Sequence, residues 1–344
     1  MKSRIVDGAR LTAAEIAAWR DLALACVPDG NAFISPTFTQ AAAQAWPGRV
    51  KACLIDSGSD AIAVLPYQFS SGFAAALGAA VRVGEEMSDY FGVIAAPDLR
   101  FATDELLGLA GLSHLYFTHL EERQTGRGLA GEKAAGGLRI LLPDGGPAYL
   151  DALARSDAKF SKDTERRLRK AVQDLGEARF CLDEPDPATW LPRVLAEKRA
   201  QYLRTKNVDW LADPGRRKLM EILAGGREPD CRPVVSTLMF GDKWAAIHFG
   251  LRSHRTLHYW FPVYNPDLGT YAPGRLLLYH VIREAQTAGI AIIDRGEGET
   301  QAKKDFPSER HTFYSGVWFR PGVRALIYRA YQSAAWRLAE ATRK

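Results

Sequence analysis

Apolar and polar positions in the first half of the chain predict one helix followed by a series of short strands. Residues 12–26 have the pattern of an amphipathic helix, and Thr12 with Glu15 three residues later has the spacing of a capping box. Two apolar stretches on either side of a Ser/Gly/Asp turn form a predicted hairpin. The elements predicted for the rest of this half are strands at 50–55, 61–68 and 114–120, a helix near 104–109, and an exposed glycine-rich loop over 122–137.

The second half repeats this order with longer elements. Two helices precede three strands that are separated by short polar turns, and a further helix and a buried strand follow. The helices are predicted at 161–175, 188–204 and from Pro273 on, and the strands at 233–240, 243–252, 256–262 and 290–293. Because helix, antiparallel strands, helix and strand occur twice in the same order, the pattern indicates two pseudo-repeats.

The length of the chain agrees with a division into two parts. A chain of 344 residues exceeds the usual size of one domain. We therefore expect two domains, at 1–148 and 149–344, in an α/β (α+β) protein whose mixed central sheets are flanked by helices.

The start of the helix after residue 270 has the features of an anion site. Tyr271, Ala272, Pro273, Gly274 and Arg275 lead into an apolar helix. Pro273 and Gly274 fall in the first turn, where unpaired N–H groups and the positive end of the helix dipole favour an anion. Gly274 has no Cβ to keep a ligand from the backbone, and Arg275 adds a charged donor. The pattern predicts a pyrophosphate site.

The strand at 290–293 leads directly into a polar segment. Asp294 ends this strand, and Lys303 follows after a short stretch rich in Gly and Glu. The carboxyl ends of buried strands are where ligands bind in open α/β sheets. Lys303 can stabilise developing negative charge, or it can be a surface residue beside Lys304. Asp294 can accept an amine proton or orient Lys303, and it can equally cap the loop that follows.

A basic cluster on the predicted 161–175 helix is a second candidate site. Arg166, Arg169 and Lys170 lie about one turn apart, so they can clamp an anionic acceptor or phosphates. Basic helix faces are also often only solvated. The net charge of +5 fits a polyanionic ligand such as a nucleotide cofactor, an anionic sugar or a membrane surface, and it does not choose among them.

Several single residues have both a functional and a packing interpretation. Tyr264 and Tyr271 lie between a strand and the anion-site helix, where each is either a proton donor or a packing residue. Gly250 marks a predicted bulge in the 243–252 strand, which is the candidate for the cofactor-facing strand. His254 and His258 have a metal-ligand spacing, but they fall in a hairpin without a third ligand, so no metal is expected.

Composition and apolar run lengths indicate where in the cell the protein is expected and whether it spans a membrane. The chain is 47% hydrophobic and 25% charged, as in ordinary globular proteins. Its four cysteines are scattered without C-x-x-C spacing, its N-terminus lacks a signal-peptide pattern, and no apolar run reaches the roughly 18 residues that span a bilayer. We expect a cytoplasmic protein. A basic amphipathic helix at 323–338 either packs on the core or contacts an anionic membrane leaflet.

The motifs resemble those of a known enzyme family when they are taken in order. Tyr-x-Pro-Gly-Arg-Leu-Leu from Tyr271, Asp-x-Gly-x-Gly from Asp294, and Lys-x-x-Phe from Lys303 are similar to the acyltransferase family of the GNAT superfamily that is associated with bacterial cellulose and exopolysaccharide biosynthesis. This family is related to the Fem-type aminoacyl transferases. The segment 88–92 and the basic helix also match in character and order. The chain departs from the family at Ala302, where relatives usually carry an aromatic residue.

This resemblance implies a fold, a reaction and a set of roles. It implies tandem GNAT-like domains, of which the second is catalytic and the first is structural or binds the acceptor. The implied co-substrate is acetyl-CoA or a longer acyl-CoA, and the implied acceptor is an amine such as an amino sugar. Lys303 aligns with a lysine at the reaction centre of Fem-type relatives. The resemblance also implies peripheral contact with the membrane or with polysaccharide-synthesis machinery.

Two other functions stay open on the sequence. A Fem-type transferase would take its acyl group from charged transfer RNA, but the chain shows no long helical arm for RNA, so a nucleic-acid partner is not expected. A non-catalytic module would bind a nucleotide or act as a scaffold for a polysaccharide synthase.

Overall fold

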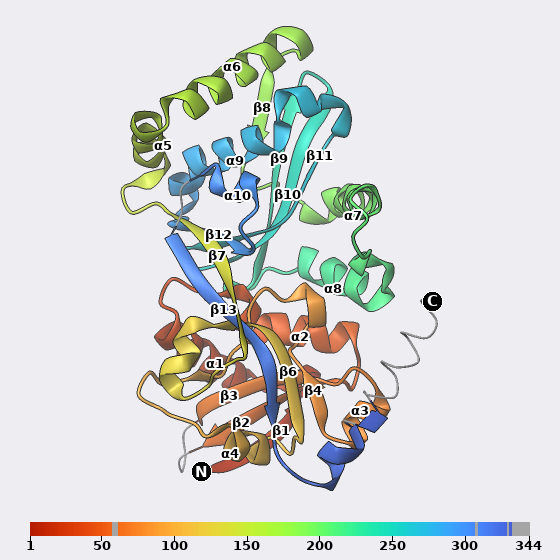
Figure 1. Ribbon diagram of the computed structural model, residues 1–344. Coiled ribbons are helices and arrows are strands. Elements are labelled where there is room, and N and C mark those ends of the chain that lie inside the picture. The colour runs from red at the N-terminus through yellow and green to blue at the C-terminus, as the bar shows by residue number, and fades with distance from the viewer. Residues whose placement is uncertain (57–60, 307–308, 329, 332–344) are drawn as a thin grey trace. The chain divides into compact units, whose positions relative to one another are not determined.

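The structure divides into two compact units. The computed structural model describes residues 1–56, 61–306, 309–328 and 330–331 of the chain (Figure 1). Unit 1 consists of Met1–Pro28, Phe33–Ala135 and the residues from Thr312 on, and unit 2 consists of Asp29–Ala32 and Gly136–His311.

Unit 1 is built on a mixed sheet with the strand order β1-β2-β3-β4-β6-β13, and β5 pairs with β3. The strands β1 to β4 pair antiparallel, β4 and β6 pair parallel, and β6 and β13 pair antiparallel. Its strands are β1 (Lys2–Asp7), β2 (Val50–Asp56), β3 (Ala61–Gln68), β4 (Ala79–Val81), β5 (Ile94–Ala95), β6 (His114–Glu121) and β13 (Glu309–Phe319).

Helices cover the sheet of unit 1. Helix α1 packs on β3 and β5, and α2 packs on β2. Leu65, Leu106 and Phe117 are fully buried in the core between these elements. The helices are α1 (Ala13–Cys26), α2 (Pro36–Ala45), α3 (Gly72–Ala76) and α4 (Thr103–Leu109), with 3-10 turns η1 (Gly8–Arg10), η2 (Ala32–Ile34), η3 (Glu85–Met87) and η4 (Glu122–Arg127).

Within unit 2 the strands follow the order β7-β12-β11-β10-β9-β8, with parallel and antiparallel pairs. The strands β8 to β11 pair antiparallel, β11 and β12 pair parallel, and β12 and β7 pair antiparallel. Its strands are β7 (Lys133–Leu141), β8 (Ala178–Cys181), β9 (Arg232–Phe240), β10 (Lys243–Ser253), β11 (Thr256–Tyr264) and β12 (Ile292–Glu297).

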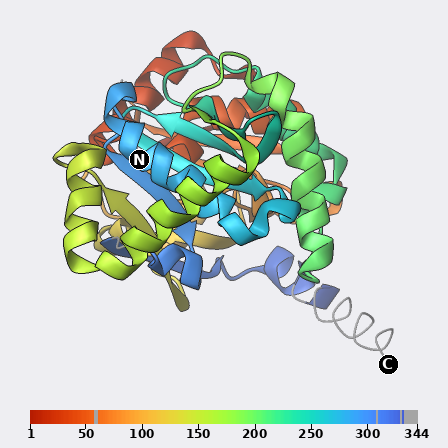
Figure 2. The same cartoon turned by 90° about the horizontal axis from the view of Figure 1, so that it is seen from above.

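Helices lie on both faces of the second sheet. Helix α7 packs on β9, β10 and β11, and α9 packs on the same strands from the other side, next to α5 and α6 (Figure 1). The view from above shows α7 and the α5–α6 pair on opposite sides of these strands (Figure 2). The helices are α5 (Gly145–Ser156), α6 (Ala158–Leu175), α7 (Pro187–Arg204), α8 (Pro214–Ala224), α9 (Pro273–Glu284) and α10 (Gln301–Lys304), with η5 (Trp210–Ala212), η6 (Pro266–Tyr271) and η7 (Ala285–Ala288).

Local sequence signals located most of these elements correctly. Thr12 and Glu15 form the predicted capping box at the start of α1, with both reciprocal hydrogen bonds present. The predicted hairpin strands correspond to β2 and β3, although residues 57–60 of the turn lie outside the described residues. The predicted fold class, α/β units with mixed sheets flanked by helices, is confirmed.

Two predicted elements were wrong in their extent. The supposed exposed loop at 122–137 contains η4 and the start of β7, because Gln124 and Arg127 turn inward to bond the backbone of residues 93–96. The strand expected at 290–293 starts at Ile292 and continues to Glu297, because β7 pairs along it.

The compact units differ from a division after residue 148. Strand β7 belongs mainly to unit 2, where Ile140 pairs with Ile293 of β12. The short segment from Asp29 to Ala32 also belongs to unit 2, since the Asp29 carbonyl accepts hydrogen bonds from Arg255 and Thr256. The chain from Thr312 on belongs to unit 1, because β13 pairs with β6.

The C-terminal helix predicted at 323–338 is described only in part. Residues 323–328 and 330–331 are helical, and the others of this range lie outside the described residues. Ala325 is buried, whereas Val323 and Leu326 are 74% and 64% exposed. Packing of the whole apolar face on the core is therefore not seen in the described part of this helix.

Candidate functional site

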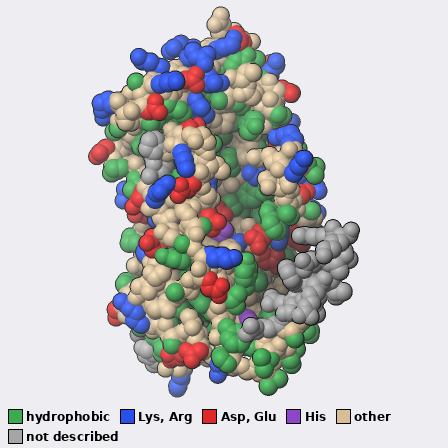
Figure 3. Space-filling view, viewed as in Figure 1, with side chains coloured by type: hydrophobic (Ala, Val, Ile, Leu, Met, Phe, Trp, Pro, Cys, Tyr) green, Lys and Arg blue, Asp and Glu red, His purple; other side chains and the backbone are tan. Residues whose placement is uncertain are grey.

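A cavity of about 410 Å³ opens in unit 2 where β11 ends and α9 begins. Its walls come from the end of β11, from Gln201 of α7, from the first turn of α9 and from the segment around α10. Figure 3 shows a hollow with hydrophobic side chains on its walls in this part of the molecule. Its size lies within the usual range for small-molecule sites. The residues that carry the argument below are Tyr259, Tyr264, Gly274, Arg275, Arg295 and Asp305.

The cavity exists because two parallel strands diverge. The register between β11 and β12 runs only from Thr256–Ile292 to His258–Asp294. Beyond these pairs β11 continues to Tyr264 and β12 to Glu297. Backbone N–H and C=O groups that lose a strand partner need another one. The diverging part of β11 therefore presents an edge with which an extended ligand can pair.

The first turn of α9 faces the same cavity. Ala272, before the helix, has left-handed backbone angles (φ 55°, ψ 54°), and no side chain caps the helix. Pro273 has no N–H to donate, and the N–H of Arg275 is used by the Ala272 carbonyl at 3.0 Å. A Cβ on Gly274 would meet nothing closer than Tyr264 Cδ1 at 4.0 Å. A side chain at position 274 would thus enter open space, and the backbone N–H of Gly274 belongs to the first turn of the helix, at its positive end.

Tyr259, which lines this cavity, has an unusual hydroxyl. The hydroxyl oxygen is buried and has no hydrogen-bond partner among the described residues. The ring stacks on His248 with centroids 4.0 Å apart and planes 9° apart. Burial raises the pKa of Tyr259, so the phenol stays protonated at neutral pH. An unpaired buried donor that lines a cavity is free to bond a ligand oxygen.

Arg295 lines the cavity and supports the segment around α10, which forms one of its walls. Its guanidinium is mostly buried and donates to the carbonyls of Ala302 at 2.8 Å and of Lys303 at 2.6 Å. Burial lowers the pKa of Arg295, although an arginine keeps its charge at any physiological pH. Asp305, on the same wall, is within 3.6 Å of the Arg275 guanidinium. This wall is therefore held by charged groups beneath an apolar surface.

The structure places Lys303 and Asp294 beside the cavity rather than on its lining. The Lys303 ammonium donates to the carbonyls of Gly296 at 3.2 Å and of Glu297 at 2.7 Å. Asp294 is 3% exposed, and its carboxylate accepts from the Gly296 N–H at 2.8 Å. Both residues fix the backbone at the end of β12.

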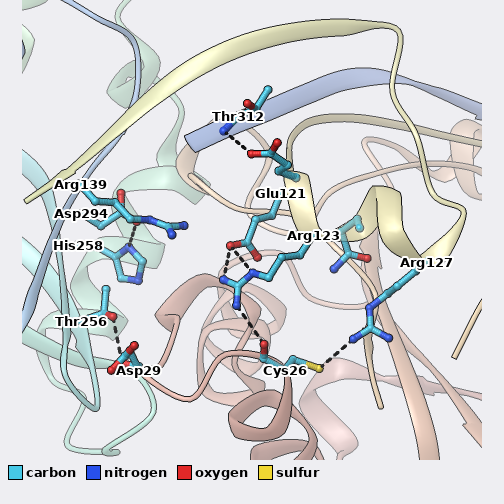
Figure 4. Close-up of polar contacts among 12 residues, drawn as sticks. Cys26, Asp29, Glu121, Arg123, Arg127, Arg139, Thr256, His258, Asp294 and Thr312 are labelled. Atoms are coloured by element: carbon cyan, nitrogen blue, oxygen red, sulfur yellow. Dashed lines mark hydrogen bonds and ion pairs between the residues drawn. The ribbon is translucent and has the colours of Figure 1, made fainter. Parts of the chain in front are cut away.

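Asp294 also takes part in a buried charge pair. Arg139 of β7 donates to Asp294 at 3.2 Å, and His258 Nδ1 lies 4.0 Å from the same carboxylate oxygen (Figure 4). His258 Nε2 accepts from the Ala32 N–H at 3.2 Å, which leaves the proton on Nδ1, facing Asp294. Together with His258, the pair links the three strands β7, β12 and β11 at the point where β11 and β12 begin to diverge.

Arg275 lines the cavity, but its charge is already offset. Its guanidinium bonds Asp163 of α6 at 3.0 Å and lies over the Phe160 ring, 4.6 Å from the centroid. The phenol of Tyr271, which the lining does not include, donates to Asp174 of α6 at 2.9 Å. These contacts fix α6 to the start of α9.

The predicted basic cluster lies on α6, away from the cavity lining. Each cation has an acidic partner on its own helix: Arg166 bonds Asp163 at 2.6 Å, Lys170 bonds Asp174 at 2.8 Å, and Arg169 lies 3.8 Å from Glu165. The arginines around Asp163 hold the pKa of that carboxyl well below its usual range. Lysine and arginine side chains nevertheless dominate the surface over α6 (Figure 3).

Gly250 is explained by packing. It marks the predicted bulge, since the register between β10 and β11 shifts between Phe249 and Leu251. A Cβ there would lie 2.3 Å from the His258 carbonyl oxygen and 2.4 Å from His248 Nε2. The cavity is lined by β11 rather than by β10, which had been the expected cofactor-facing strand.

Metal ligands and membrane-spanning helices were both considered in the sequence, and the described part of the chain shows neither a metal-ligand cluster nor a helix fit to span a membrane. Among these residues no group of three or more His, Cys, Asp or Glu side chains is placed to hold a metal ion. Likewise, none of the described helices combines the length and the apolar character that a membrane span needs.

Comparison with known proteins defines the class of the second unit. Residues 158–304 match the family described as acetyltransferase (GNAT) domain. This stretch lies within unit 2 and includes most of the cavity lining. Unit 2 therefore carries a GNAT-type acetyltransferase domain. No curated protein matches the sequence.

Solved structures resemble the whole chain in fold. The crystal structure of FemX is 8% identical and aligns over 96% of this chain and 99% of its own, with a TM-score of 0.65. The C-terminal domain of a putative lysylphosphatidylglycerol synthetase from Agrobacterium fabrum is 12% identical over 91% and 94%, with a TM-score of 0.51. A conserved protein of unknown function from Bacteroides thetaiotaomicron is 12% identical over 90% and 98%, with a TM-score of 0.52. At such identities the likeness concerns the fold alone.

Sequence reasoning missed the residues whose position depends on the fold. Tyr259 has no motif around it, and only its place beyond the last β11–β12 pair brings it to the cavity lining. Gln201 and Asp305 come from elements far apart in the sequence. A usable signal was the run Tyr-Trp-Phe-Pro at 259–262, where a proline ends a predicted strand.

The burial of His248 against Tyr259 can be tested through the pH dependence of stability. Burial lowers the pKa of His248 to about 3, whereas an unfolded histidine has a pKa of about 6.5. Between these values the unfolded chain binds a proton that the folded chain does not, so stability falls as the pH falls. We expect His248→Phe to make the free energy of unfolding depend less on pH. Between pH 6 and 5 the slope of this free energy against pH should fall by up to about 1.4 kcal/mol per pH unit.

Urea unfolding at pH 7, 6 and 5 measures this slope. The matched control is His254→Asn, because His254 is exposed and asparagine tolerates its positive φ of 50°. The control should keep the slope of the unchanged protein. An unchanged slope in His248→Phe would show that His248 titrates normally in the folded state.

Proposed function

We propose that the protein is an acyl-CoA-dependent N-acyltransferase that moves an acetyl or longer acyl group onto an amine. One observation carries this proposal. Within a stretch that matches a GNAT acetyltransferase domain, a cavity lies between two diverging parallel strands and ends at an uncapped helix N-terminus. Such a site offers backbone partners to an extended arm and an anion site to a diphosphate.

The residues of the cavity have distinct parts in the proposed binding. The Gly274 N–H and the dipole of α9 face the diphosphate, and Arg275 adds little net charge because Asp163 and Asp305 already pair with it. The edge of β11 after His258, beyond its last pair with β12, bonds the amide groups of the pantetheine arm. The acyl group then lies near Tyr259, deeper than the phosphates.

The transfer step follows from these positions. The lone pair of a neutral amine attacks the thioester carbonyl carbon, and negative charge develops on the carbonyl oxygen. The Tyr259 hydroxyl donates a hydrogen bond to this oxygen. The C–S bond breaks as the carbonyl re-forms, the nitrogen loses its proton to solvent, and Tyr264, which is 41% exposed on the cavity lining, donates a proton to the leaving thiolate.

Lys303 and Asp294 act in this proposal as positioning residues. The Lys303 ammonium donates to the Gly296 and Glu297 carbonyls, and the Asp294 carboxylate accepts from the Gly296 N–H. Together they fix the end of β12 and hence the width of the gap between β11 and β12. The basic face of α6 lies beside α9, where it can attract an anionic acceptor.

The biological setting is a further part of the proposal. The order of motifs resembles that of enzymes of bacterial cellulose and exopolysaccharide biosynthesis, so we propose an amino sugar of an envelope polysaccharide as the acceptor. A cytoplasmic place at the inner face of the membrane, in contact with polysaccharide-synthesis machinery, would supply this acceptor.

A second candidate function is aminoacyl transfer from charged transfer RNA. The observation that favours it is the likeness in fold to FemX over nearly the whole of both chains. Release of a radiolabelled amino acid from charged RNA would support this function. Nucleotide binding without turnover of any thioester or charged RNA would support a binding or scaffold module instead.

Substitution of Gly274 tests the anion site. We expect Gly274→Glu to fold, since the position is open, and to lose measurable affinity for acetyl-CoA, because a carboxylate would occupy the helix N-terminus and repel the diphosphate. Isothermal titration with acetyl-CoA and with a longer acyl-CoA measures the affinity.

The control for this experiment is Gly274→Gln, which has the same size without the charge. It should weaken binding less than Gly274→Glu does. Binding of acetyl-CoA to Gly274→Glu with unchanged affinity would contradict the site, and absence of binding to the unchanged protein would favour one of the other two functions.

Removal of the Tyr259 hydroxyl tests its part in the transfer step. We expect Tyr259→Phe to lower kcat by about a hundredfold with little change in acyl-CoA affinity. Stability should stay the same or rise, because the hydroxyl has no partner in the folded state. A loss of stability with unchanged kcat would show a purely structural residue.

Removal of the Lys303 ammonium tests the positioning role. Lys303→Ala should lower kcat by about tenfold or more, since a small displacement of a catalytic wall is costly, while acyl-CoA affinity stays nearly intact. The adjacent Lys304→Ala is the control, because Lys304 is a half-exposed residue that pairs with Glu299. Equal turnover in the two variants and the unchanged protein would remove Lys303 from the mechanism.

A further inference from the structure

Unit 1 contains a cavity of its own, of about 230 Å³. It lies where residues 91–97 and the segment from Glu121 to Arg127 separate, next to the end of α1. A single parallel bridge, between Phe91 and Leu120, joins the two segments just before they diverge. The match to the acetyltransferase domain begins only at residue 158, so it does not include this cavity.

The cavity lining carries an excess of positive charge. Three arginines and one glutamate line it: Arg100, Arg123, Arg127 and Glu121. Glu121 is already paired with Arg123, which also donates to the Cys26 carbonyl at 3.1 Å (Figure 4). Three positive charges against one negative charge leave a formal balance of +2 on the lining.

Arg127 is the buried member of this group. It is 7% exposed, and its guanidinium donates to the carbonyls of Ala95, at 2.8 Å, and Ala96, and lies 3.7 Å from Cys26 Sγ (Figure 4). No carboxylate of the described residues pairs with it. Neutral carbonyls satisfy its donors without neutralising its charge, and a buried charge without a counter-ion is costly. An anion in the cavity would offset that cost.

The remainder of the lining is apolar. Ile34, Phe91, Val93 and Ile94 all line the cavity and are buried. A bare inorganic ion would leave this surface uncovered. The combination of arginines at one part and aliphatic and aromatic side chains at another fits an anionic group attached to an apolar body.

The strand edge of this cavity is closed, unlike that of β11. The Gln124 side-chain amide bonds both backbone groups of Val93. It accepts from the N–H at 3.2 Å and donates to the carbonyl at 3.1 Å. A Cβ on Gly92 would lie 2.5 Å from Gln124 Nε2, so the amide is packed against the backbone there. An extended arm has no strand edge to pair with, and the ligand must therefore be compact.

We propose that this cavity of unit 1 binds a compact organic anion, a carboxylate or phosphate ester on an apolar body, with Arg127, Arg123 and Arg100 as its anion contacts. The site is separate from the acyl-CoA site of unit 2 in its residues and in its chemistry. It gives unit 1 a ligand of its own, either a part of the acceptor or a small effector.

Calorimetric titration of the full chain with benzoate and with phenyl phosphate tests the site. Benzyl alcohol, which has the apolar body without the charge, and inorganic phosphate, which has the charge without the body, are the ligand controls. We expect saturable binding of at least one organic anion and at least tenfold weaker binding of both controls. Equal binding of benzyl alcohol, or no binding of either organic anion, would overturn the proposal.

Variants locate the binding. Arg127→Gln should lower the affinity for the organic anion by about tenfold or more, because a charge-assisted hydrogen bond is lost. The double change Arg100→Gln with Arg123→Gln should do the same. Arg10→Gln, an exposed arginine of η1 in the same unit, should have no effect. If Arg127→Gln fails to fold, the double variant decides, and unchanged affinity there would contradict the site.

The same titration in Gly274→Glu separates this site from the proposed acyl-CoA site. Binding of the organic anion should persist in that variant while acetyl-CoA binding is lost. Loss of both would place the anion at the start of α9 and would overturn the proposal for unit 1, leaving the acyltransferase proposal intact.

Discussion

The short parallel register between β11 and β12 is the constraint on which the site of unit 2 depends. Three residue pairs hold the strands together, and the buried Asp294–Arg139 pair, with His258 nearby, lies at the last of them. Beyond that point the strands part. The cavity, the open edge of β11, the depth of Tyr259 and the access to the first turn of α9 all follow from this separation.

The charged groups around the cavity act mainly on its walls. Arg295 holds the carbonyls of α10, Lys303 holds those of β12, and Asp163 joins three arginines from α6 and α9. A wall built in this way is rigid without a strong net field. Selectivity for a ligand then comes from the geometry of backbone donors and from a few unpaired groups, of which the Tyr259 hydroxyl is the clearest. This arrangement suits transfer chemistry, where donors must already be aimed at the place at which charge develops.

Sequence patterns located most of the elements, because those features are local. Capping of α1 by Thr12, the bulge at Gly250 and the open first turn at Gly274 each depend on a few neighbouring residues. The partners of Lys303 and the inward turn of Arg127 could not be predicted, since each depends on backbone groups that the fold brings close. Strand β11 was assigned as a strand, but its divergence from β12 is a property of pairing and leaves no periodicity in the sequence.

The segment from Asp29 to Ala32 has a consequence for any attempt to divide this protein. The chain passes between the two units after Pro28, after Ala32, within β7 and within β13. Neither unit is therefore a continuous stretch of sequence, and a cut at any single peptide bond leaves at least one of them without a part of its fold. The two units are interlaced along the chain, so gene fusion of two complete copies in a row cannot by itself account for the present connectivity.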